Sequence, residues 1–259
     1  MRLNQSDAND DNDMHNTGHV MWPSAVLLAH YLSKNPSVVY GKDETPGDIL
    51  ELGSGCGLAG LTAATLLQNN SNNDDKVIFT DYNEDCLKLL EKNICLNEFD
   101  TDHKVIGLDW FDQQPVDNDV EEEKKDVTRE ENTWLGMDGL GHEQVRLILG
   151  ADLLVCSNDA DLVAGTIDNV LMEGGRAIIV GPDEWTRFGV RNFPEACRSL
   201  GLKVSVDEDM LEANENESEQ DDSQQQLMNE LELGGFNQRS STSDHDFTMF
   251  TIDKPITSA

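Results

Sequence analysis

The sequence predicts an α/β fold built on one seven-stranded sheet, mostly parallel, with an antiparallel hairpin at its C-terminal end. Short apolar runs alternate along the chain with helical patterns, which is typical of strands joined by crossover helices. The first apolar run ends in a glycine-rich turn that leads directly into a helix. The last two strand-like runs have no clear helical pattern between them, and this favours antiparallel pairing.

The first half of the chain supplies the first two strands and their helices. A helix is expected after Pro23, whose fixed φ angle suits a first helical turn. The run 48–53 predicts a short buried strand, and a helix rich in small residues is expected over 58–67. A second strand is expected over 76–82, and the run 83–96 has leucine and isoleucine at helical spacing.

The alternation continues along the rest of the chain. A third strand is expected over 103–110, and a fourth strand with its exit loop over 145–154. A helix over 159–172 then leads to a fifth strand over 174–182. The run 190–202 is expected to be helical, with its internal proline in the first turn, where a missing N–H group does little harm.

The two closing strands distinguish between kinds of parallel sheet. The run 203–209 predicts a sixth strand, and the run 245–253 alternates apolar and polar residues as a seventh strand would. No helix is expected between them, so they should pair as an antiparallel hairpin at the edge of the sheet. Dinucleotide-dependent dehydrogenases usually keep this part of the sheet parallel.

The 259 residues are expected to form one domain with a tail and two insertions. Residues 1–17 are polar and acidic, with too few apolar groups to fold alone, and predict a disordered tail. The domain is expected over 18–254. Acidic, low-complexity insertions interrupt it at about 113–143 and 208–242.

The charge of the chain excludes some classes of partner. It has 18 Lys and Arg against 51 Asp and Glu, a formal net charge of -33. Such a surface repels nucleic acids and anionic membranes, which are bound mainly through Lys and Arg. It favours a basic partner, such as a basic protein substrate. The alternative is that the acids lie in the insertions and serve only solubility.

The cysteines and the N-terminus indicate the compartment. The five cysteines are scattered and contain no CxxC pair, so neither a disulfide framework nor a zinc site is expected. Reduced thiols fit a cytoplasmic protein, or one that also enters the nucleus. No run resembles a signal peptide or a membrane span. We expect a monomer, and nothing in the sequence requires a metal ion.

The strongest local motif is ILELGSGCGLAG, a strand that leads through a glycine turn into a helix. Gly53, Gly55 and Gly57 would let the backbone turn sharply and approach a ligand closely. The start of the helix would present free N–H groups to that ligand. By its letters the motif also satisfies the G-x-G-x-x-G pattern of dinucleotide-binding proteins, so the glycines alone leave the ligand open.

Two acidic residues narrow the choice of ligand. Glu51 precedes the first glycine by two positions, where a carboxylate would repel a pyrophosphate but attract a cationic ligand. A glutamate at a strand end can alternatively cap a neighbouring helix. Asp81 ends the second strand, where an acid accepts hydrogen bonds from both ribose hydroxyls of an adenosine ligand.

Acids and a tryptophan end the next two strands. Asp109 and Trp110 end the third strand, where they could hold the exocyclic amine and wall the ring of an adenine, although Trp110 could equally be core. Asp152 follows the fourth strand, beside the point where strand order reverses. Its carboxylate would hold and orient a target amine. A turn-forming or helix-capping aspartate is the alternative.

Four runs together resemble methyltransferase family 16, which holds many protein-lysine methyltransferases. The resemblance covers about residues 17–112 and 144–206 and the closing strand, and implies a Rossmann-like, seven-stranded methyltransferase sheet that binds S-adenosylmethionine. The runs are GHVMWPSAVLLAHYL, ILELGSGCGLAGL, IFTDYNEDCLKLLEKNICLN and LILGADLLV.

Carried over by position, the resemblance implies a cofactor site and one catalytic residue. Asp152 would be catalytic, as the first residue of the family's D-x-x-Y/F motif. Val155 departs from that motif, because the family has an aromatic residue there that can line a lysine channel. The cofactor-binding residues would be Trp22, Glu51, Gly53, Gly55, Asp81, Asp109, Trp110 and Ala151.

These observations together predict an S-adenosylmethionine-dependent N-methyltransferase that modifies a side-chain nitrogen of a protein, with lysine preferred. Catalysis would come chiefly from positioning and desolvation, and Asp152 would orient the amine and ease its deprotonation. A small-molecule N-methyltransferase and a catalytically silent binding protein of the same fold are the alternatives. A dehydrogenase would leave Glu51, Trp22 and the closing hairpin unexplained.

Overall fold

The structure is a computed structural model that describes most of the predicted domain. The described residues are 1, 3, 17–41, 46–70, 75–110, 144–182, 187–207 and 247–256. Both predicted insertions lie outside these ranges, as does nearly all of the predicted tail, so they stay predictions. Within the described ranges, no helix is both long enough and apolar enough to span a membrane.

One seven-stranded sheet runs through the described residues, in the order β3-β2-β1-β4-β5-β7-β6. Strands β1 to β5 pair in parallel, whereas β7 pairs antiparallel with both β5 and β6. The predicted fold class and the closing hairpin are thereby confirmed. The strands are β1 (Ile49–Leu52), β2 (Val77–Asp81), β3 (Lys104–Gly107), β4 (Val145–Ala151), β5 (Leu171–Pro182), β6 (Lys203–Asp207) and β7 (Phe247–Asp253).

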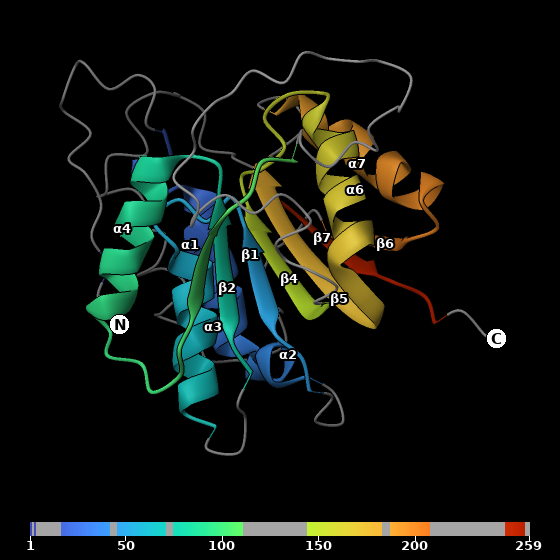
Figure 1. The fold of residues 1–259 in the computed structure, drawn as a ribbon. Helices are drawn as coiled ribbons and strands as arrows, with labels where there is room; N and C mark the ends of the chain where they lie inside the picture. Colours follow the sequence, from blue (N-terminus) through green and yellow to red (C-terminus); the bar gives the residue numbers. More distant parts are fainter. Residues whose placement is uncertain are drawn as a thin grey trace, which may run out of the picture.

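Helices cover both faces of the sheet and make a three-layer arrangement (Figure 1). Helices α1, α3 and α4 lie on one face, and α6 and α7 lie on the other. The helical segments are η1 (Thr17–His19), α1 (Pro23–Lys34), α2 (Pro36–Tyr40), α3 (Leu58–Gln68), α4 (Glu84–Cys95), α6 (Asp159–Val170) and α7 (Phe188–Ser199).

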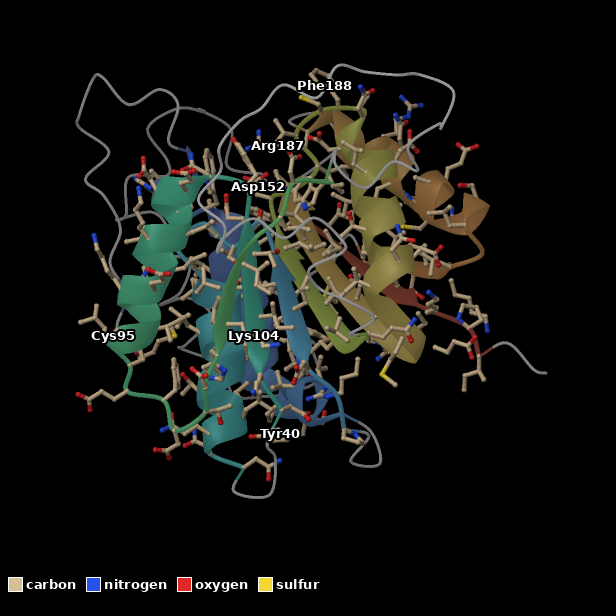
Figure 2. All side chains as sticks on the ribbon, in the orientation of Figure 1. Tyr40, Cys95, Lys104, Asp152, Arg187 and Phe188 are labelled. Carbon is tan, nitrogen blue, oxygen red and sulfur yellow. The ribbon has the colours of Figure 1, made fainter. Side chains whose placement is uncertain are left out.

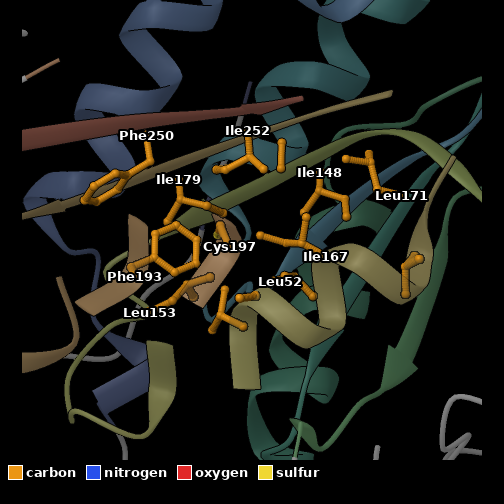
Figure 3. Packing of buried hydrophobic residues seen from close by; sticks show 14 of the residues in the cluster. Leu52, Ile148, Leu153, Ile167, Leu171, Ile179, Phe193, Cys197, Phe250 and Ile252 are labelled. Carbon is orange, nitrogen blue, oxygen red and sulfur yellow. The ribbon is translucent and has the colours of Figure 1, made fainter. Parts of the chain in front are cut away.

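The core is divided by the sheet into two apolar clusters. Alternate residues of a strand point to opposite faces, so in β4 Ile148 packs toward α6 and α7 while Leu149 packs toward α1 and α3. Figure 3 shows the first cluster, where Phe193 of α7 and Phe250 of β7 pack edge to face, with ring centroids 5.2 Å apart. Both faces of β4 are buried, as expected for a central parallel strand.

Three local predictions need correction. Pro194 was expected in the first turn of its helix, but α7 begins at Phe188 and places the proline in the helix interior. Its ring therefore removes one backbone hydrogen bond from α7. The short helix α2 lies between α1 and β1, where no helix was expected. Strand β5 begins at Leu171, three residues before the glycine pair that was expected to start it.

Helix α4 begins with a side-chain cap that makes its start specific. Asn83 accepts hydrogen bonds from the amides of Asp85 at 2.9 Å and Cys86 at 3.4 Å. We expect Asn83→Ala to lower the free energy of unfolding by about 1 kcal/mol, because these amides lose their acceptor. Urea unfolding measures the change. Asn83→Asp keeps the acceptor and should retain most of the stability, so an equal loss in both variants would contradict the capping role.

The topology fixes where a ligand can lie. Strands β1 and β4 are neighbours, but the chain continues from β1 toward β2 on one side and from β4 toward β5 on the other. The helices that follow these strands therefore lie on opposite faces, and a crevice opens between them at the carboxyl ends of β1 and β4.

Candidate functional site

A cavity of about 550 Å³ lies at this crevice, above the carboxyl ends of β1, β2 and β4. Figure 2 shows Asp152 at this end of the sheet and Tyr40 at the opposite end. The volume suits a nucleoside-sized ligand. All the predicted site residues line the cavity, from five segments of the chain: Trp22, Glu51, Gly53, Gly55, Asp81, Asp109, Trp110, Ala151 and Asp152.

The loop between β1 and α3 has a backbone that side chains would disturb. Gly53, Gly55 and Gly57 have φ angles of 54°, 51° and 83°, in the left-handed region. A Cβ atom on Gly55 would come within 2.7 Å of the carbonyl oxygen of Gly18. The predicted need for glycine is therefore confirmed at the level of the backbone.

Glu51 is the third residue of β1, just before this loop, with 4% of its surface exposed. Burial raises the pKa of Glu51 to about 7, although backbone amides in the first turn of α3 and the Ser54 hydroxyl pull it down. Its Oε2 atom is buried, and among the described residues none makes a hydrogen bond to it. Glu51 thus lies beside the start of a helix and also lines the cavity, so its position fits both predicted roles, as a helix cap and as a group that attracts a cationic ligand.

Asp81 ends β2 on the other side of the glycine loop. Its carboxylate accepts hydrogen bonds from the amides of Gly55 and Asn83, both at 2.9 Å. Burial raises the pKa of Asp81 against the opposing effect of these bonds. A carboxylate has about four lone-pair positions, so these two bonds do not exhaust its capacity to accept from a ligand.

Two tryptophans, an alanine and an aspartate line the other sides of the cavity. Trp110 lines it and also packs against the core cluster. Asp109 lies beside it on the cavity wall, and Trp22 and Ala151 line the wall near β4. Trp22 is 36% exposed, which places it at the mouth of the cavity.

Asp152 has a partner that no sequence motif indicated. Arg187, the N-cap residue of α7, donates to both oxygens of Asp152, from Nε at 2.7 Å and from Nη2 at 3.0 Å. Asp152 itself has a φ angle of 57°, which is unusual for a residue other than glycine. It does not cap α6, because Asn158 holds that position. The available signal for Arg187 was only its place after the fifth strand.

The N-terminal segment before α1 also contributes to the site. Gly18 packs over the glycine loop, and the thiol of Cys56 donates to its carbonyl oxygen at 3.6 Å. Burial raises the pKa of Cys56 to about 12, so this thiol stays protonated near neutral pH. Cys56 and Cys86 line the cavity as apolar groups.

Curated proteins with similar sequences are methyltransferases by name. The protein-lysine N-methyltransferase EEF2KMT of Bos taurus is 30% identical over 184 residues, which are 70% of this chain and 49% of that protein. The calmodulin-lysine N-methyltransferase of Arabidopsis thaliana is 31% identical over 116 residues, 43% of this chain and 35% of that protein. The chain spans about half the length of the first of these relatives.

Solved structures with similar folds are more distant in sequence. The [4+2]-cyclase SpnF has a TM-score of 0.52 at 13% identity, over 93% of this chain and 85% of that one. The CurJ carbon methyltransferase also has a TM-score of 0.52, at 12% identity, over 90% of this chain and 54% of that one. At such identities the likeness shows the fold alone.

A family model described as lysine methyltransferase matches residues 4–127, which include the N-terminal segment, the glycine loop and the first three strands. Those are the segments that carry most of the motifs singled out in the sequence. Together with the relatives, this match confirms the predicted membership in methyltransferase family 16.

Proposed function

We propose that the chain is an S-adenosylmethionine-dependent methyltransferase that modifies a side-chain nitrogen of a protein, with lysine as the preferred acceptor. The observation that carries this proposal is one cavity that brings two buried carboxylates, Glu51 and Asp81, to a left-handed glycine loop. The family match and the names of the relatives support it.

The residues of the cavity fit this cofactor. The buried Oε2 of Glu51 receives no hydrogen bond from the described residues, and a cationic ammonium group would supply one. Asp81 accepts from two backbone amides at 2.9 Å and keeps capacity to accept from a hydroxyl of a ribose. A pyrophosphate, in contrast, would meet two buried acids and no described Lys or Arg on the cavity wall.

The acceptor side of the cavity is formed by Asp152, Trp22 and Ala151. When bound, S-adenosylmethionine supplies a methyl group on a positively charged sulfur, which is already a reactive donor. The protein then has to position the acceptor nitrogen and exclude water. Asp152 orients that nitrogen by accepting its N–H group, and the Trp22 ring covers the mouth of the cavity.

The surroundings of the cavity favour a protein acceptor over a small molecule. Val155 replaces the family aromatic residue and is 48% exposed at the rim. Tyr82 lines the cavity and Phe188 follows Arg187, and both are largely exposed. Exposed aromatic groups around a site suit contact with a protein surface. The acidic chain adds attraction for a basic one.

Calorimetric titration of the purified protein with S-adenosylmethionine, and with NAD in parallel, tests the cofactor. We expect saturable binding of S-adenosylmethionine alone, weakened roughly tenfold or more by Asp81→Ala, because hydrogen bonds to a charged group are lost. Asp161→Ala removes an exposed acid of α6 outside the cavity and should bind as the unaltered protein does.

A labelled-methyl screen of cell lysate then tests the acceptor. Label in protein, released as methylated lysine after hydrolysis, is the expected result. Label only in small molecules would favour a small-molecule N-methyltransferase, and cofactor binding without any labelled product would favour a silent binding protein. Preference for NAD would overturn the proposal as a whole.

A further inference from the structure

The carboxylate expected to meet the acceptor is already paired within the chain. Arg187 holds both oxygens of Asp152 in a two-point contact, and Figure 2 shows the two residues together at the carboxyl end of the sheet. The side chain of Asp152 is 6% exposed and that of Arg187 is 22% exposed. A two-point contact of this kind, shielded from water, is much stronger than an exposed ion pair.

The guanidinium of Arg187 also contacts Trp22, another residue on the acceptor side of the cavity. The Cζ atom of Arg187 lies 5.6 Å from the centre of the Trp22 ring, within the range of a cation–π contact. Arg187 therefore joins the end of β4 to the residue that precedes α1. Both of its partners line the cavity, and Arg187 satisfies the two kinds of contact that a cationic acceptor would seek.

We propose that Arg187 is a specificity-determining residue, which neutralises Asp152 and admits an acceptor nitrogen in its uncharged form while opposing a cationic one. The proposal rests on the proposed function, because it names the charge state of the acceptor at that same site.

Charge and geometry both support this selection. A cationic acceptor has to displace the guanidinium from Asp152 and Trp22 before it gains the same contacts. The net binding free energy that it gains from this exchange is therefore small. An uncharged amine needs no displacement, because the two-point contact leaves further lone pairs on Asp152 that can accept its N–H group. A lysine acceptor would then lose its proton before it reaches Asp152, and Asp152 would orient the nitrogen without serving as its base.

A matched pair of small probes tests the selection by charge. n-Butylamine is protonated at neutral pH and resembles a lysine side chain, whereas n-butanol has a similar shape without the charge. Their affinities are measured by NMR titration, with and without S-adenosylhomocysteine. We expect Arg187→Gln to strengthen binding of the cation roughly tenfold and to change binding of butanol by less than about twofold.

Three control variants separate selection by charge from loss of structure. Arg187→Lys keeps the positive charge and should bind both probes as the unaltered protein does. Asp152→Asn, added to Arg187→Gln, should remove the gain for the cation. Asp152→Asn alone leaves Arg187 without its counter-ion and should weaken binding of the cation relative to butanol.

The proposal fails if Arg187→Gln gives no gain for the cation, whether both probes weaken together or neither binds. A purely structural role for Arg187 predicts such a common loss. The charge test is also made without S-adenosylhomocysteine, so it decides the role of Arg187 even if that ligand does not bind. Failure to bind S-adenosylhomocysteine would count against the proposed function alone.

Discussion

Replacing Gly55 with alanine is expected to lower the affinity for S-adenosylmethionine by roughly 100-fold or more. The φ angle of 51° costs an alanine about 1–2 kcal/mol in the left-handed region. The added Cβ atom would also lie 2.7 Å from the carbonyl oxygen of Gly18, a backbone atom that a side-chain rotation cannot move away. The loop relieves both strains only by shifting, and it then loses the amide bond from Gly55 to Asp81.

Two other glycines serve as controls that separate a general loss of stability from a loss of affinity caused by the glycine loop. Gly201 has a φ angle of 83° but open space around a built Cβ atom, so Gly201→Ala should lose stability and keep full affinity. Gly165 lies in α6 with open space and no positive φ angle, so Gly165→Ala should gain roughly 0.5–1 kcal/mol of stability. Affinity is measured by calorimetry and stability by urea unfolding.

The comparison has a clear contrary outcome. If Gly55→Ala loses stability as Gly201→Ala does but binds S-adenosylmethionine with unchanged affinity, the glycine loop is a structural turn and not a ligand site. A loss of affinity in Gly201→Ala as large as in Gly55→Ala would show that general destabilisation causes the effect.

Most of the strands were predictable because they are short, apolar and followed by a clear break. The apolar run at 145–154 predicts the strand that the structure has as β4. The lack of a clear helical pattern in the sequence between the last two strand-like runs predicts the antiparallel closing pair. Element ends were harder. Pro194 lies inside α7 because tertiary packing holds that helix together, here through the buried Phe193, and local propensity alone does not weigh this.

The candidate site was predictable for a similar reason. Its residues follow the strands directly, and parallel strands bring their carboxyl ends to one edge, so positions far apart in sequence meet there. Arg187 could not be found in this way, because it lies 35 positions from Asp152 in the sequence. Its contact with Asp152 depends on where its side chain points in the folded protein. Gly18 likewise acquires its role only where its carbonyl meets Gly55.

Glu51 lies where both of its predicted roles, capping a helix and binding a cationic ligand, remain open to it. Its carboxylate lies next to the first turn of α3, where an added Cβ atom on Gly60 would come within 2.5 Å of Oε2. Yet the helix start does not satisfy that oxygen, since no described residue gives it a hydrogen bond. The backbone amides of Ala59 and Gly60 lower the pKa of this carboxyl group, yet they leave Oε2 without a hydrogen bond. The energetic cost of burying this acid is consistent with a ligand role.

That cost predicts a pH-dependent stability. The pKa of Glu51 is raised to about 7 in the folded protein, from an ordinary value of 4.5, so the folded state binds the extra proton between these values. Stability should therefore fall as the pH rises from about 4.5 through about 7, by roughly 3 kcal/mol from this one group. The glutamine side chain in Glu51→Gln cannot ionise, so this variant should not show this loss of stability as the pH rises.

The measurement is urea unfolding of both proteins between pH 5 and 8, followed as the difference in free energy of unfolding. The difference cancels the groups that do not interact with Glu51, so that the pH dependence which remains comes from Glu51 and its coupling to Asp81. Relative to the unaltered protein, Glu51→Gln should become progressively more stable as the pH rises. Its affinity for S-adenosylmethionine should be lower than that of the unaltered protein. A difference that stays constant with pH would mean that Glu51 ionises normally, and the argument that its buried oxygen awaits a cationic ligand would fail.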